Sequence, residues 1–199
     1  MMLIAWSLAA ALFDHPRHPP ATLSSPRLAR AHCGVTIAVD RSHDISDLLI
    51  QAMLTETAAI WKPLGVALRW GTSADRDSSA MTVHVIVTDD PTPRSSTMER
   101  LGWIHFVAPD EPEPIVYVSR FAALELLNST SRLRQYPDRR RDLLLSRMLG
   151  RALAHELGHY LLASRTHTSY GLMRSTWPLD VLLANERVGF GLSEPRHTL

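Results

Sequence analysis

The sequence has almost no cysteine and almost no net charge. Cys33 is the only cysteine in 199 residues, which excludes an intramolecular disulfide framework and any cysteine-rich zinc module. Lysine and arginine together number 21 and aspartate and glutamate 20, giving a formal net charge of +1. This balance gives no reason to expect nucleic acid as a partner, and we interpret the arginine-rich stretch 132–142 as a solvated surface. With 45% hydrophobic and 21% charged residues, the composition is that of a globular domain.

A hydrophobic run long enough to cross a membrane is also missing. The apolar or small residues from Leu3 to Phe13 number eleven, whereas a spanning helix needs roughly 20. This is the length of a signal-peptide core, with Ala9 and Ala11 placed as in a cleavage site, although no lysine or arginine precedes it. We therefore predict that residues 1–13 are a signal peptide or hydrophobic leader and that the protein is secreted or periplasmic. The alternative is a first helix of the fold.

The rest of the chain divides into a linker and one domain. Residues 14–33 hold four prolines and no apolar periodicity, which predicts an extended, proline-rich linker. Residues 34–199 carry alternating and helical apolar patterns of a single α+β domain. The patterns predict strands at 35–40, 66–71, 81–89, 101–108 and 114–120, and helices over 45–61, over 121–129, from about Asp138 onward and within 178–189.

One stretch, "RALAHELGHYLLASRTHTSYGLM" (151–173), carries residues suited to chemistry. His155 and His159 are four apart, so on a helix both imidazoles project from one face and can share a tetrahedral Zn²⁺. Glu156 is rotated by about 100° from His155, so it flanks the metal and can act as a base. The bare motif arises by chance in roughly 2% of chains of this composition. Its position in a strongly apolar helix, followed by another histidine, favours a metal site over a plain amphipathic helix.

The segment "HELGHYLL", followed by a histidine and then by "GLM", resembles the zinc-binding motif of the metzincin clan of zinc endopeptidases. The resemblance is closest to the matrix metalloproteases. The resemblance implies that His155 and His159 bind zinc together with a third histidine, that Glu156 is the general base, and that Met173 lies in a turn beneath the metal. It also implies a mixed, mostly parallel sheet with an antiparallel edge strand, a long active-site helix and a short C-terminal subdomain. "LGWIHF" takes the place of the edge strand that borders the cleft.

The sequence departs from this family after the second histidine. In the family a glycine three residues later ends the helix, and the third histidine lies three residues beyond that; here those positions are Leu162 and Arg165. Because leucine does not easily adopt a positive φ, we predict that the helix continues to Ala163 or Ser164 before the chain reverses. Two extra residues span at most about 7 Å, which is enough to return His167 to the metal.

Other ligand sets remain open at this point. Glu186 could be the third ligand of a gluzincin-like peptidase, but the aspartate that supports such a ligand in that family is missing, and a surface glutamate beside Arg187 is the simpler interpretation. Asp180 is better placed to cap a helix. "HCGV" around Cys33 faintly resembles the inhibitory cysteine segment of matrix metalloprotease pro-segments, and a thiolate is a good zinc ligand. A thiol at the start of a strand is the simpler interpretation.

The function predicted is that of a zinc-dependent endopeptidase in which Glu156 accepts a proton from the attacking water and delivers it to the leaving amine. We expect a protein or peptide substrate, extended along the edge strand, and an enzyme that acts as a monomer. A zinc-bound binding or regulatory module without activity is the alternative, which the intact Glu156 disfavours. The residues do not distinguish a peptide from another amide as the substrate.

Overall fold

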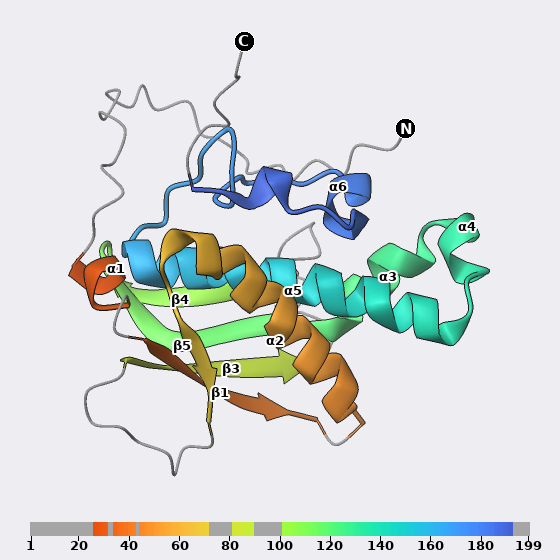
Figure 1. The fold of residues 1–199 in the computed structure, drawn as a ribbon, viewed down its shortest axis with the longest axis horizontal. Coiled ribbons are helices and arrows are strands. Elements are labelled where there is room, and N and C mark those ends of the chain that lie inside the picture. Colours follow the sequence, from red (N-terminus) through yellow and green to blue (C-terminus); the bar gives the residue numbers. More distant parts are fainter. Residues whose placement is uncertain (1–25, 32–33, 43, 72–80, 90–100, 193–199) are drawn as a thin grey trace.

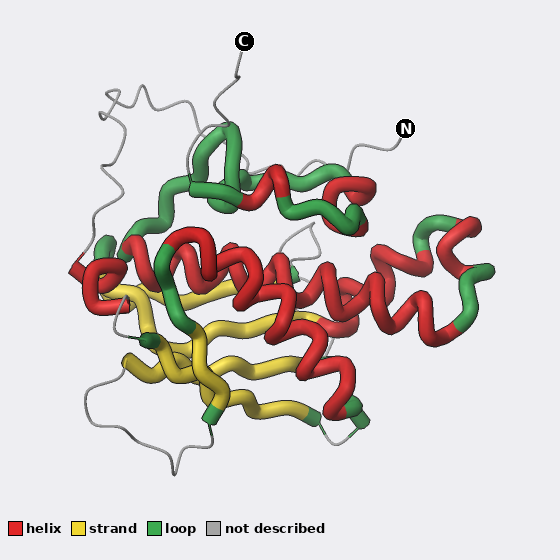
Figure 2. The backbone as a smooth tube through the Cα atoms, in the orientation of Figure 1, coloured by secondary structure: helices red, strands yellow, loops and turns green. Residues whose placement is uncertain are grey.

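The computed structural model describes residues 26–31, 34–42, 44–71, 81–89 and 101–192. It shows an α+β domain in which a five-stranded sheet is covered on one face by the two longest helices (Figure 1). A separate layer of loops and short helices, formed by the C-terminal part of the described chain, lies on the other side of these helices (Figure 2). The predicted leader, residues 1–13, and Cys33 lie outside the described residues.

The sheet is mixed and mostly parallel, with one antiparallel edge strand, as predicted. Its strands are β1 (Val35–Arg41), β2 (Leu68–Trp70), β3 (Met81–Thr88), β4 (Gly102–Ala108) and β5 (Glu111–Ser119), in the order β2-β1-β3-β5-β4. β4, which contains "LGWIHF" from its glycine onward, is an edge strand, and its pairing with β5 is the one antiparallel pairing among the described residues. Alternation builds one buried face: in β3, Val83, Val85 and Val87 are buried and His84 is exposed.

Helices form in the four predicted regions, and two short helices, the first and the fourth in the chain, form where none was predicted. The helices are α1 (Pro26–Ala31), α2 (Asp47–Trp61), α3 (Arg120–Asn128), α4 (Ser131–Arg134), α5 (Asp138–Leu162) and α6 (Leu179–Leu183), with 3₁₀ turns η1 (Lys62–Leu64) and η2 (Val188–Phe190). The Ser46 hydroxyl caps α2 by accepting the Leu49 N–H at 3.2 Å, and Ser119 caps α3 in the same way. α5 begins directly after Pro137, where proline favours extended backbone. No helix of the described chain has both the length and the hydropathy to cross a bilayer.

The prediction of an extended linker is wrong for residues 26–31, which form α1. Arg27 places its guanidinium 5.0 Å from the ring centre of Tyr160 and donates a hydrogen bond to the Pro112 carbonyl at 3.3 Å. Ala31 is fully buried. These contacts make α1 part of the domain. The local sequence has no apolar periodicity, so the helix depends on contacts with residues far along the chain. Residues 14–25 lie outside the described chain.

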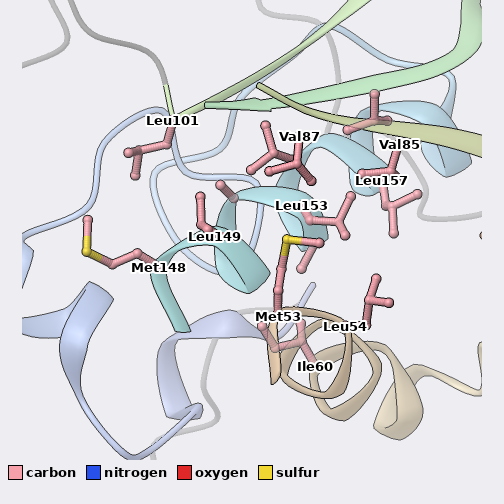
Figure 3. Packing of buried hydrophobic residues seen from close by; sticks show 14 of the residues in the cluster. Met53, Leu54, Ile60, Val85, Val87, Leu101, Met148, Leu149, Leu153 and Leu157 are labelled. Carbon is pink, nitrogen blue, oxygen red and sulfur yellow. The ribbon is translucent and has the colours of Figure 1, made fainter. Parts of the chain in front are cut away.

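Close packing of α2 against α5 holds the histidine-bearing helix in place. A Cβ atom on Gly150 would lie 2.6 Å from the Met53 carbonyl oxygen, so only glycine lets the two helices come this near. Buried polar groups add direction: the Thr57 hydroxyl donates to the Gly150 carbonyl at 3.0 Å, and the Trp61 indole N–H to the Ala154 carbonyl at 3.2 Å. Leucines of α5 then fill the space toward β3 (Figure 3).

Candidate metal centre

Three histidines from two segments converge at the end of α5. His155 and His159 lie one turn apart on the helix, and His167 returns from the loop that follows. The His159 Nε2 atom is 3.1 Å from the His155 Nε2 and 3.3 Å from the His167 Nε2. Within the described chain, these three form the one group of potential ligands close enough to hold a metal ion.

Backbone carbonyls fix the tautomers of the two helical histidines. The His155 Nδ1–H donates to the Leu172 carbonyl at 2.8 Å, and the His159 Nδ1–H donates to the Ser164 carbonyl at 2.6 Å. A carbonyl oxygen can only accept, so each Nδ1 carries the proton and each neutral ring leaves a bare lone pair on Nε2. Two bare lone pairs only 3.1 Å apart repel each other unless a cation lies between them.

Both rings stay neutral near pH 7. Burial, with the neighbouring His159 as a smaller cause, lowers the pKa of His155 to about 3. Burial also lowers the pKa of His159 to about 4, against an opposing effect of its hydrogen bond to Ser164. Metal binding requires neutral imidazoles, so no proton has to be removed from these two ligands at neutral pH.

The donor set fits a metal of the imidazole-binding class. Four-coordinate geometry with metal–nitrogen bonds of about 2.0–2.1 Å separates neighbouring ligand atoms by about 3.3 Å, close to the separations of 3.1 and 3.3 Å seen here. His155 and His167 stack with their planes 9° apart, and His159 is nearly perpendicular to both. Three protein ligands of this kind leave one position for water or substrate, which is the pattern of a catalytic site rather than a structural one.

The Glu156 side chain extends from α5 to the start of the edge strand. It is 8% exposed, and a Cβ atom on Gly102 would lie 2.9 Å from its Cγ and 3.4 Å from its Oε1. The glycine at the first position of β4 therefore makes room for the carboxylate. Sequence reasoning placed Glu156 beside the histidines but missed Gly102, because the contact joins residues 54 positions apart.

Met173 packs against the underside of the same helix. A Cβ atom on Gly158 would lie 2.3 Å from the Met173 Sδ, so the glycine just before His159 is what admits the sulfur. The Met173 carbonyl accepts the Thr168 N–H at 2.8 Å, which ties the methionine to the loop that carries His167. The predicted methionine turn thus lies against the ligand-bearing helix, and Gly158 is a site residue that the sequence analysis missed.

The helix ends one residue earlier than the predicted range. Leu162 is the last residue of α5, and Ala163 adopts φ 50° and ψ 43°, the left-handed conformation. Its N–H donates to the Tyr160 carbonyl and the Ser164 N–H to the His159 carbonyl, as in other left-handed helix ends. The prediction failed because it considered a positive φ only at Leu162, whereas alanine one residue later adopts it at a smaller steric cost.

Ala163→Gly is expected to raise the free energy of unfolding by about 0.5–1 kcal/mol. Glycine adopts the left-handed conformation without the steric cost that alanine has, and its greater backbone freedom in the unfolded state offsets part of this gain. Urea denaturation of the metal-free protein measures it. Ser164→Gly is the matched control and is expected to bring no gain, since its φ is not positive. A destabilised Ala163→Gly variant contradicts this helix end.

The competing ligands lie elsewhere. Glu186 is exposed and does not belong to the histidine group; its carbonyl accepts a hydrogen bond from Arg151 at 2.9 Å. Asp180 lies in the first turn of α6 and not at its N-cap, which is Pro178, so its predicted capping role is wrong. The hypothesis of inhibition by Cys33 falls on a residue outside the described chain.

Comparison with protein families, with curated proteins and with solved structures gave no match. The function must therefore be inferred from the arrangement of the residues themselves.

Proposed function

We propose that the protein is a zinc-dependent endopeptidase of metzincin-like architecture. One observation carries the proposal: three convergent imidazoles stand beside a nearly buried glutamate that faces an edge strand. His155, His159 and His167 would hold the ion. Zinc in such a site supplies a Lewis acid that polarises a carbonyl and lowers the pKa of water toward 7.

The remaining chemistry comes from side chains of this chain. Glu156 is next to His155 in sequence and held against Gly102, so its carboxylate borders the space between α5 and β4. In the proposed reaction it accepts a proton from the attacking water and delivers that proton to the amine that leaves. Burial of the glutamate limits its motion between these two tasks.

The edge strand suits an extended peptide. In the described chain β4 pairs with β5 on one side only, so its other side presents backbone N–H and carbonyl groups that a peptide can use as an added strand. This favours a protein or peptide over a small amide as the substrate, because a small amide gains nothing from a row of backbone groups.

Metal removal and a ligand variant test the proposal together. The full-length protein is expected to bind one zinc and to cleave members of a quenched-fluorescent peptide library, to lose cleavage on chelation, and to regain it on addition of zinc. His167→Ala is expected to weaken zinc binding by at least about 100-fold, since loss of a ligand exceeds the 10–100-fold cost of losing an outer partner. Zinc content by mass spectrometry and competition with a chelating dye are the measurements.

Glu186→Ala is the matched control and should keep both zinc and activity. The reverse pattern, in which Glu186→Ala loses zinc and His167→Ala keeps it, would show a gluzincin-like ligand set. Zinc bound without cleavage of any library member would support the binding module instead.

A further inference from the structure

Arg165 occupies the position where the resemblance places the third histidine, and its side chain extends to the edge strand. Its Nη2–H donates to the Phe106 carbonyl at 3.3 Å, and its guanidinium carbon lies 4.8 Å from the centre of the Phe106 ring. The lengthened loop between His159 and His167 thus has an effect beyond placing His167 beside the other two histidines. It brings a permanent positive charge to the end of β4.

The backbone on both sides of Arg165 is fixed by the metal centre. The preceding Ser164 carbonyl accepts the His159 Nδ1–H at 2.6 Å, and the Thr166 N–H donates to the Ser164 hydroxyl at 3.1 Å. Two residues after Arg165, His167 joins the ligand group. The backbone of Arg165 is therefore held next to the histidine group while its guanidinium contacts the edge strand at Phe106, so a peptide lying along that edge would pass close to it.

The charge of Arg165 has no carboxylate partner in the described part of the chain. The ion pairs found there involve Arg41, Arg120, Arg151 and Arg187, and the exposed acids of the neighbouring turn, Asp110 and Glu111, form none with Arg165. A guanidinium has five N–H donors, and the contact with Phe106 uses one of them. The others have no partner among the described residues, and the side chain is exposed.

We propose that Arg165 is a specificity residue that binds a carboxylate of the substrate, so the enzyme prefers acidic peptides. This rests on the proposed peptidase function. Along β4, Gly102 contacts the proposed general base and Phe106 contacts the guanidinium. The two positions are four residues apart, which is about 13 Å at the rise of an extended chain. A paired substrate strand has the same rise, so the acid lies about three or four residues from the bond that is cut. Arginine suits this role since it binds carboxylates with two parallel hydrogen bonds.

Matched peptides test the inference. Quenched peptides blocked at both ends carry a single glutamate, or glutamine in its place, at each position around the scissile bond. The zinc-loaded full-length protein is expected to favour glutamate at one such position by about tenfold in kcat/KM, mainly through KM. The preference should shrink between 50 and 500 mM salt (about 14 Å to about 4 Å of screening length), because the pair is exposed. A second peptide series with a free or an amidated C-terminus tells a side-chain carboxylate from a terminal one.

Arg165→Gln isolates the charge. Glutamine is polar but uncharged and shorter than arginine, so zinc content should be unchanged while the preference for glutamate over glutamine peptides disappears. Arg165→Glu should favour lysine at the same position. Arg139→Gln removes the same charge from the exposed first turn of α5 and is expected to keep the preference.

Each outcome decides the matter. Equal cleavage of the glutamate and glutamine peptides by the wild type, or a preference that survives in Arg165→Gln, overturns the inference and leaves the peptidase proposal standing. If the zinc-loaded wild type cleaves no peptide, both fail together. Loss of zinc from Arg165→Gln assigns the residue a structural task and also overturns the inference.

Discussion

Glu156→Gln is expected to bind zinc as the wild type does and to hydrolyse peptides about 10²–10⁴ times more slowly. The amide has the size of the carboxylate, so it keeps the packing against Gly102, but it cannot accept a proton from water. The loss should appear in kcat, because Glu156 acts on the reacting groups and not on the ground-state binding of the peptide.

The measurement is kcat on the best library peptide, with zinc content determined on the same sample. Glu125→Gln removes an exposed carboxylate from α3 and should leave both values unchanged. A Glu156→Gln variant that keeps more than about a tenth of the wild-type kcat would place the proton acceptor elsewhere. If the variant instead loses its zinc, Glu156 supports the metal centre and the catalytic assignment is wrong.

Local geometry explains why much of this site could be predicted from the sequence. The spacing of His155 and His159 places them on one helical face by the period of the helix alone, and the prediction required only that residues near 155 be helical. The alternation in β3 and the apolar pattern of α2 are equally local. The edge position of β4 was predicted from a resemblance, and the strand order confirms it.

Contacts between distant residues account for what the sequence did not predict. Gly102 admits Glu156, and Gly158 admits Met173, yet neither glycine differs from a turn or helix glycine when the sequence is considered alone. α1 forms within a proline-rich stretch because Tyr160 and the Pro112 carbonyl are there to receive Arg27. Such partners become visible only once the sheet and α5 have been assembled.

Arg151 is the largest buried polar side chain that the sequence analysis overlooked. It lies one turn before His155 on α5 with its side chain fully buried, and its Nε donates to Glu56 Oε1 at 2.9 Å. Its terminal nitrogens donate to three backbone carbonyls of the C-terminal segment at 2.5–2.9 Å: Val181, Ala184 and Glu186. The second oxygen of Glu56 accepts from Arg187. One ion-pair cluster thus joins α2, α5 and the C-terminal segment.

The cluster also reaches the metal centre through the backbone. The guanidinium of Arg151 lies 4.5 Å from the centre of the Phe190 ring, and the next residue, Gly191, accepts the Leu172 N–H at 2.7 Å. The Leu172 carbonyl in turn accepts the His155 Nδ1–H at 2.8 Å. The segment that Arg151 holds is therefore the segment that orients the first histidine.

Arg151→Met is expected to lower the free energy of unfolding by about 3–5 kcal/mol, because removal of one partner leaves the Glu56 carboxylate buried with only Arg187 to balance it. Zinc affinity should also fall by about 10–100-fold, the usual effect of disturbing an outer partner of a ligand. Urea denaturation of the metal-free protein gives the first quantity, and competition with a chelator gives the second.

Two further variants separate charge from packing. Arg147→Met, one turn earlier on α5, removes a half-buried arginine whose contact is a single hydrogen bond to the Leu183 carbonyl, and it should cost about 1 kcal/mol. Arg151→Met combined with Glu56→Leu should be more stable than Arg151→Met alone, since no unpaired carboxylate then remains inside. If the double variant is as unstable as the sum of the two single ones, the carbonyl contacts of Arg151, and not its pairing with Glu56, hold the C-terminal segment. In that case zinc affinity should fall in both variants that lack Arg151 and stay unchanged in Glu56→Leu.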